Sequence, residues 1–204
     1  MKKELLITAL VVIFSFGGAS AQDAKEKHTA QQIYDFFAQY SPNDVVEYAA
    51  EAVKYFGKIA PNSVTLSVKE EEQVMGKALK EFNEKPRKYQ WSHLPFTPSI
   101  VVQRCDEGRV VAHPIPDFFP IMSQKGFIKK YKDVKGRKIG VILCQETNEK
   151  GAWALQHQWW PLTDEPLDMG FFMIRIPGTP YEIQSFYPTQ KYSEAQLKKL
   201  IFDE

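Results

Sequence analysis

The chain of 204 residues lacks the composition of a nucleic-acid-binding, multi-span membrane or disordered protein. Lys and Arg number 26 and Asp and Glu number 25, which gives a formal net charge of +1. Without a basic excess, we expect no nucleic-acid partner. Only one long apolar run is present, so several membrane spans are excluded. The hydrophobic share of 44% and the charged share of 25% are those of an ordinary globular chain.

Sequence motifs for several common chemistries are also absent. No glycine-rich phosphate loop follows a strand pattern, and no Gly-x-Ser-x-Gly nucleophile turn is present. The histidines His28, His93, His113 and His157 include no pair at His-x-x-x-His spacing, so a helical metal site has no support. No pair of carboxylates stands out for acid–base work. We therefore expect a protein that is not an enzyme and holds no metal and no cofactor.

The N-terminus has the pattern of a secretory signal peptide over residues 1–21. Two lysines follow Met1, residues 5–16 form an apolar run, and Ala19-Ser20-Ala21 fits a small-residue cleavage site. The run is shorter than the roughly 20 residues of a membrane span. We expect cleavage, no stable membrane insertion and a periplasmic mature chain from Gln22 to Glu204, forming a single domain. The alternative is an uncleaved anchor.

Cysteine is scarce, with Cys105 and Cys144 as the two examples. No Cys-x-x-Cys is present, which removes the signature of a thioredoxin-like site or a c-type haem. An even count in an exported chain favours a disulfide, which would close a loop of about 40 residues and contribute about 3–4 kcal/mol. The alternative is two buried thiols that behave as small apolar residues.

Residues 29–85 form the predicted helical region. The first amphipathic helix covers residues 28–40. The second begins with the Ser41-Pro42 cap, runs to about residue 59 and stops before Pro61. The third opens with the capping box Ser67–Glu70 and ends before Pro86.

Residues 98–188 form the predicted sheet region. Prolines after His113 are expected to prevent regular structure through a long connection, which a helix over 137–149 follows. A last helix is predicted over 193–202. Helices followed by about five short strands indicate an α+β fold with an antiparallel sheet. The predicted strands cover residues 99–104, 109–113, 153–160, 170–176 and 181–187.

Tryptophan gathers in the sheet region and indicates a ligand pocket. Alternation along the strand over 153–160 places Trp153 and Trp159 on one face, and Gln156 and Gln158 on the other. Indoles beside a few polar groups are typical of small-ligand sites, and Trp91 precedes the same region. The alternative is that these indoles belong to the core.

Arg104, Arg175 and His113 are further candidates for the pocket. An arginine that points inward from a strand needs an anion, which is either an internal carboxylate or a ligand. The alternative is an outward, solvated arginine. His113 would make ligand affinity change between about pH 5.5 and 7.5 if it lies in the pocket. The alternative is a structural histidine whose hydrogen bonds are satisfied.

The order of several motifs resembles a bacterial single Cache domain. A strand, a Cys-Asp-x-Gly turn and a returning strand that ends in Val-Ala-His-Pro occupy residues 101–114. Gly151-Ala152-Trp153, Trp160-Pro161 and the turn 177–181 before the last strand fit as well. The resemblance covers roughly residues 79–187.

This resemblance implies a PAS-like fold, in which long N-terminal helices pack on a central antiparallel sheet. Cache domains are extracytoplasmic sensors that bind small molecules, often carboxylates or amino acids, on one face of the sheet. They usually form the outer part of a chemoreceptor or histidine kinase. Because the sequence ends at Glu204 without a second membrane segment or a signalling domain, we expect a free-standing periplasmic form.

The leading hypothesis is a secreted, sensory, non-catalytic Cache domain protein. Its ligand would be a small carboxylate or another small metabolite, and its partner in signal transduction a membrane sensor kinase or chemoreceptor. Either Arg104 or Arg175 would hold the anionic group. The other expected pocket residues are His113, Gln156 and Gln158 as hydrogen-bonding groups, with Trp91, Trp153 and Trp159 as walls.

Two other hypotheses stay open from the sequence. One is a protein-interaction module that docks on a membrane sensor or forms a homodimer through the helices of residues 29–84. The other is a periplasmic enzyme that uses Cys105 or a histidine.

Overall fold

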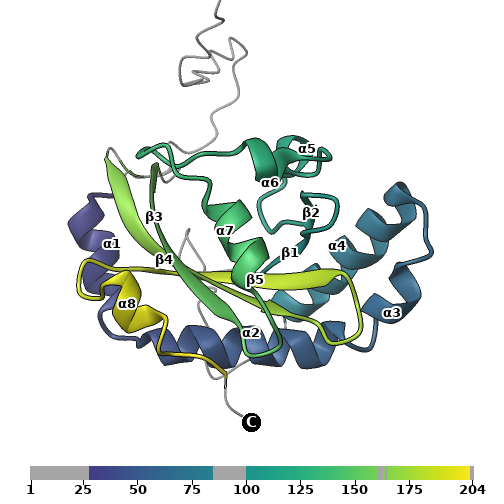
Figure 1. Cartoon of the computed structure of the whole chain (residues 1–204), viewed down its shortest axis with the longest axis horizontal. Helices are drawn as coiled ribbons and strands as arrows, with labels where there is room; N and C mark the ends of the chain where they lie inside the picture. The colour runs from purple at the N-terminus through teal and green to yellow at the C-terminus, as the bar shows by residue number, and fades with distance from the viewer. Residues whose placement is uncertain (1–27, 85–99, 160–162, 164, 203–204) are drawn as a thin grey trace, which may run out of the picture.

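Helices precede a five-stranded antiparallel sheet, which confirms the predicted α+β fold class (Figure 1). The structure is a computed structural model that describes residues 28–84, 100–159, 163 and 165–202. The predicted signal peptide over 1–21, Trp91 and Trp160 lie outside these ranges. Within them, no helix is both long enough and apolar enough to cross a membrane.

Two of the three long N-terminal helices begin at the predicted caps Ser41 and Ser67, whereas the first begins after Thr29, whose capping role was not predicted. The three helices are α1 (Ala30–Phe37), α2 (Pro42–Phe56) and α4 (Val68–Glu84). The short α3 (Ala60–Ser63) was not predicted, because Pro61 was expected to end helical structure. Proline is compatible with the first turn of a helix, where its missing N–H would have no intrahelical partner.

The sheet has the strand order β2-β1-β5-β4-β3, and all its pairs are antiparallel. Strand β4 begins at Pro166, four residues before its predicted start at Gly170, and pairs with β3 over the full length of β3. Pro166 occupies the first strand position, where proline is tolerated. The strands are β1 (Val101–Arg104), β2 (Arg109–Ala112), β3 (Ala152–Trp159), β4 (Pro166–Arg175) and β5 (Tyr181–Pro188).

Strand alternation gives the sheet two faces with different covers. The core face carries Phe172, Ile174 and Tyr187 and packs against the N-terminal helices; the Tyr187 hydroxyl donates to the backbone carbonyl of Phe37 in α1. The opposite face, called the cavity face here, carries residues such as Arg175 and is covered by helices from the connection between β2 and β3.

That connection is more regular than the sequence predicted. It contains α5 (Phe119–Met122) and α6 (Phe127–Lys130) before α7 (Ile139–Glu146), which lies in front of the sheet in Figure 1. Pro120 falls in the first turn of α5, where proline does not interrupt a helix. The last helix, α8 (Glu194–Leu197), is shorter than the predicted 193–202.

Candidate functional site

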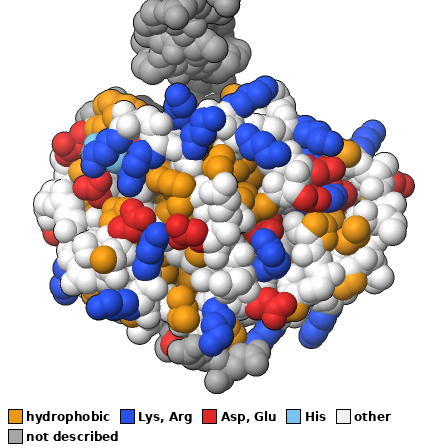
Figure 2. All heavy atoms as spheres, viewed as in Figure 1, with side chains coloured by type: hydrophobic (Ala, Val, Ile, Leu, Met, Phe, Trp, Pro, Cys, Tyr) orange, Lys and Arg blue, Asp and Glu red, His pale blue; other side chains and the backbone are white. Residues whose placement is uncertain are grey.

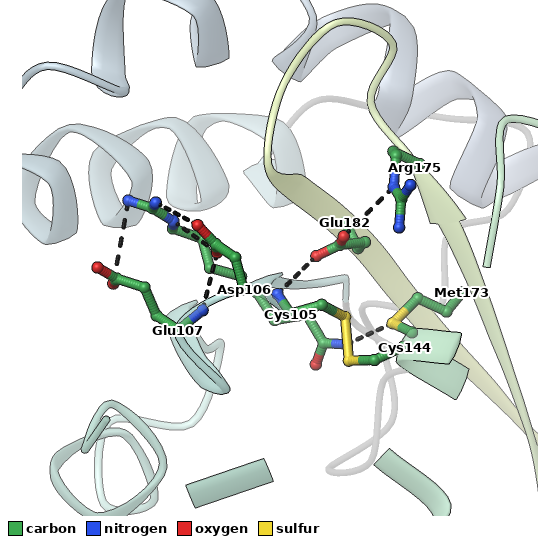
Figure 3. The surroundings of a disulfide bond; sticks show 9 residues. Cys105, Asp106, Glu107, Cys144, Met173, Arg175 and Glu182 are labelled. Atoms are coloured by element: carbon green, nitrogen blue, oxygen red, sulfur yellow. Dashed lines mark hydrogen bonds and ion pairs between the residues drawn. A yellow bond between two sulfur atoms is a disulfide. The ribbon is translucent and has the colours of Figure 1, made fainter. Parts of the chain in front are cut away.

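A disulfide joins Cys105 to Cys144 (Figure 3). The sequence left open whether these residues are paired or are free thiols, and the structure has them paired. Cys105 directly follows β1, and Cys144 lies in α7. The bond therefore ties the helical cover of the cavity face to the end of β1, an inner strand of the sheet.

A cavity of about 530 Å³ opens beside this disulfide. Its wall combines the turn after β1, helices α6 and α7, and the hairpin between β4 and β5. A concave site of this size with a few convergent polar groups is the usual form of a small-ligand site. The polar and charged residues that line it are Asp106, Lys129, Gln145, Arg175, Thr179 and Glu182.

Glu182 is a buried acid at the back of this cavity. Its residue is 2% exposed, and strand pairing places it between Gln103 of β1 and Arg175 of β4. One carboxylate oxygen accepts a hydrogen bond from the backbone N–H of Cys105 at 3.0 Å, and the other lies 3.5 Å from Nε of Arg175. Burial raises the pKa of Glu182 to about 7 despite this donor and this cation. The carboxyl group therefore changes charge near neutral pH.

Arg175 presents an incompletely used guanidinium to the cavity. Its side chain is 40% exposed, and Nε is the atom that pairs with Glu182. Within the described residues, its two terminal nitrogens have no hydrogen-bond or ion-pair partner, and Figure 3 shows Arg175 joined to Glu182. A guanidinium with free donors at the wall of a cavity can hold an anionic group by charge-assisted hydrogen bonds.

The second predicted arginine, Arg104, is engaged by carboxylates of the chain. It points to the core face, its side chain is 14% exposed, and it lies 3.1 Å from Glu71 and 2.6 Å from Asp106. Glu71 also accepts from Arg109 and, at 2.5 Å, from the hydroxyl of Tyr181. The anion that Arg104 needs is therefore supplied by carboxylates of the chain and not by a ligand.

Gln156 and Gln158 lie on the cavity face but away from the cavity. Tyr131 donates its hydroxyl hydrogen to Gln158 at 3.0 Å, and the amide nitrogen of Gln156 lies 3.3 Å from the same hydroxyl oxygen. Gln156 is 4% exposed. The three side chains hydrogen-bond to one another and form a closed polar cluster at the far end of β3.

The other predicted pocket residues lie elsewhere, which differs from the expectation of one shared pocket. Trp153 is fully buried on the core face and donates its indole N–H to the backbone carbonyl of Leu200 at 2.6 Å. Trp159 is 58% exposed at the end of β3. The imidazole of His113 accepts from the backbone N–H of Ile115, and burial lowers its pKa.

Of the predicted ligand-binding residues described here, Arg175 alone lines the cavity. Glu182, Lys129 and Gln145 were missed. One signal could have found Glu182: residues 177–180 were predicted as a turn, and a hairpin closed there places Glu182 opposite Arg175. Lys129 and Gln145 lie on short helices whose approach to the sheet has no local sequence signal.

Comparison with known proteins supports the fold. No protein-family model matches the chain, and no curated protein matches it. Among solved structures, a periplasmic sensor domain of a chemotaxis protein is 16% identical with a TM-score of 0.50, over 76% of this chain and 96% of that chain. The chain thus shares the fold of that domain.

Two further structures have lower scores. One concerns carboxylic acid recognition by a Cache chemosensory domain and is 16% identical with a TM-score of 0.48, over 80% of this chain and 100% of that chain. The other is a methyl-accepting chemotaxis protein from Vibrio parahaemolyticus RIMD 2210633, 11% identical with a TM-score of 0.46, over 79% of this chain and 94% of that chain.

Proposed function

We propose that this protein is a non-catalytic sensor domain that binds a small carboxylate, or another small anionic metabolite, in the cavity beside the disulfide. The proposal rests on Arg175, which lines a cavity of about 530 Å³ and whose terminal nitrogens have no partner among the residues that the structure describes. Arginine is suited to this role because its planar fork matches the geometry of a carboxylate. The fold of a periplasmic chemotaxis sensor domain is consistent with it.

The remaining lining of the cavity defines the kind of ligand that fits. Lys129 adds a second cation, while Glu182 and Asp106 add acceptors. A carboxylate would lie against Arg175, and a hydrogen-bond donor on the same molecule would lie against Glu182. A purely apolar molecule would cover Lys129 and the terminal nitrogens of Arg175, for which no partner is found among the described residues, and removing them from water costs free energy.

Binding without turnover is favoured by the state of the cysteines. The sulfur of Cys105 is bonded to Cys144, so it cannot act as a thiolate nucleophile while the disulfide is intact. The enzyme hypothesis based on Cys105 therefore loses its nucleophile.

Export by the predicted signal peptide over 1–21 would place the domain in the periplasm. A membrane sensor kinase or chemoreceptor would there bind the domain and respond to whether its ligand is bound.

The interaction-module hypothesis has less support. The apolar stripes of α1 and α2 are buried against the sheet, with Phe37 at 1%, Val45 at 0% and Phe56 at 0% exposure. These stripes are part of the core and are not available to dock another protein, whereas α4 exposes Val68 at 55% and Val74 at 39%.

A thermal-shift screen with small carboxylates, α-amino acids, amines and neutral sugars tests the proposal. A ligand at 100 times its dissociation constant stabilises by about 2.7 kcal/mol, or roughly 5–10 °C for a domain of this size. We expect hits among the carboxylates and their loss in Arg175→Ala. Hits confined to amines or sugars, or hits unchanged in Arg175→Ala, would contradict the proposed anion site.

A further inference from the structure

A basic segment that includes α6 and continues to the start of α7 runs along one rim of the molecule. Seven of the fourteen residues 125–138 are Lys or Arg, and this segment is called the basic arm here. The whole chain has a formal net charge of only +1, so positive charge is concentrated in this arm. Figure 2 shows Lys and Arg side chains gathered along the upper rim of the face in view.

The one acid of the arm does not neutralise this surface. Asp133 is 6% exposed, and its carboxylate accepts from the backbone N–H and the guanidinium of Arg137 at 2.7 and 3.2 Å. Lys135 lies 3.8 Å from Asp168, but its side chain is 59% exposed. The other lysines are all exposed, and no ion pair joins them to any part of the chain that the structure describes. They are Lys125, Lys129, Lys130, Lys132 and Lys138.

The arm is fixed to the sheet by hydrogen bonds. The backbone N–H of Val134 donates to the carbonyl of His157 in the edge strand β3 at 2.9 Å, and Tyr131 donates to Gln158 in the same strand. A turn closed by Asp133 follows, with Gly136 at φ +79°, a conformation that favours glycine. The lysines are therefore held at one rim by a rigid support.

Exposed apolar side chains lie where the arm meets the edge strand. Tyr131 is 37%, Val134 51% and Trp159 58% exposed. Tyr131 bonds Gln158 on the cavity face and Val134 bonds the backbone of His157, while Trp159, the next residue of β3 after Gln158, projects from the opposite face at the end of the strand. An indole and a phenol beside lysines are the residues that favour the headgroup region of a membrane. Six of the seven basic residues are lysine, which suits a diffuse negative surface better than a single phosphate that a guanidinium would grip.

We propose that the basic arm, together with Trp159, docks the protein on the surface of a bilayer that contains anionic phospholipid. The lysines would supply the electrostatic attraction, and Trp159, Tyr131 and Val134 would enter the headgroup layer. This goes beyond ligand binding in the cavity, because it gives the domain a location and an orientation at a membrane.

The test is co-sedimentation of the full chain with vesicles of phosphatidylcholine alone or with about 30% phosphatidylglycerol. Each lysine near an anionic surface increases the affinity about fivefold. A triple variant with Lys130→Gln, Lys132→Gln and Lys138→Gln should therefore bind about 100-fold more weakly than the wild type. The matched control changes three exposed lysines outside the arm, Lys58, Lys69 and Lys77, to Gln and should bind within about threefold of the wild type. All variants carry the same N-terminus, so its own lipid affinity cancels in the comparison.

The variant Trp159→Ala distinguishes binding to a membrane from binding to a soluble acidic partner. We expect it to reduce vesicle binding and to remove a blue shift of the fluorescence on adding anionic vesicles, while binding to polyglutamate stays unchanged. Three results would overturn the proposal. The wild type could bind equally to vesicles with and without phosphatidylglycerol, or the arm and control variants could lose the same affinity. Vesicle binding could also be unaffected by Trp159→Ala.

Discussion

The carboxylate of Glu182 accepts a hydrogen bond from the backbone N–H of Cys105 at 3.0 Å, and its second oxygen lies 3.5 Å from Nε of Arg175. A single buried acid thus connects the disulfide turn, strand β5 and the cation proposed to hold the ligand. Its charge affects the stability of the fold as well as the electrostatic potential of the cavity.

Stability should depend on pH through this residue. Burial raises the pKa of Glu182 from the model-compound value of 4.5 to about 7. Between these values the folded state keeps a proton that the unfolded state has lost, so the free energy of unfolding falls as the pH rises. The loss should reach about 3 kcal/mol at neutral pH and should largely vanish in Glu182→Gln.

Urea unfolding from about pH 5 to about pH 8 measures this difference. The exposed Glu149→Gln is the matched control and should keep the pH dependence of the wild type. If Glu182→Gln and the wild type gave parallel curves, Glu182 would not titrate in this range.

Removing the disulfide should destabilise the protein by about 3–4 kcal/mol. Cys105 and Cys144 are 39 residues apart, and cross-linking such a loop restricts the unfolded chain. Guanidinium unfolding of the wild type with and without a reductant measures the change. Cys105→Ser with Cys144→Ser should match the reduced wild type and be insensitive to reductant. A reduced wild type as stable as the oxidised one would contradict the prediction.

Glu71 should contribute strongly to the free energy of unfolding, because it is the shared acid of the buried ion cluster between α4 and the sheet. Its carboxylate serves Arg104, Arg109 and Tyr181. Glu71→Ala would leave two guanidinium groups without this shared partner, and we expect a loss of about 3–5 kcal/mol. The neighbouring Glu72, with a 24% exposed side chain and one ion pair to Arg109, supplies the control. Equal losses in Glu71→Ala and Glu72→Ala would show that burial of the cluster contributes nothing.

Local signals predicted the elements of the fold well. Capping residues placed the starts of α2 and α4, because an N-cap side chain bonds its own helix and needs no distant partner. Short apolar runs, β-branched in the case of β1, and the turn residues between them predicted β1, β2, β3 and β5. The start of β4 was missed because Pro166 resembles a strand breaker when its position at the first strand residue is unknown.

The site was less predictable, because alternation shows which side chains share a face but not what covers that face. Trp153 and Trp159 do share a face, yet one is packed in the core and the other is exposed. One partner of Arg104, Asp106, is two residues away, but the buried partner is Glu71, a helical residue 33 positions earlier, and no local pattern connects Arg104 with Glu71. Arg175 and Glu182 are different, since a short hairpin turn sets their pairing.

The most direct test of the central claim is a calorimetric titration with the carboxylate or α-amino acid that gives the largest thermal shift. It should be titrated into the wild type, Arg175→Ala and Gln158→Ala, the last of which changes the closed polar cluster at the other end of the cavity face. We expect binding at least about tenfold weaker in Arg175→Ala and unchanged in Gln158→Ala. Unchanged binding in Arg175→Ala with loss in Gln158→Ala would contradict the account and move the site to the cluster of Tyr131, Gln156 and Gln158.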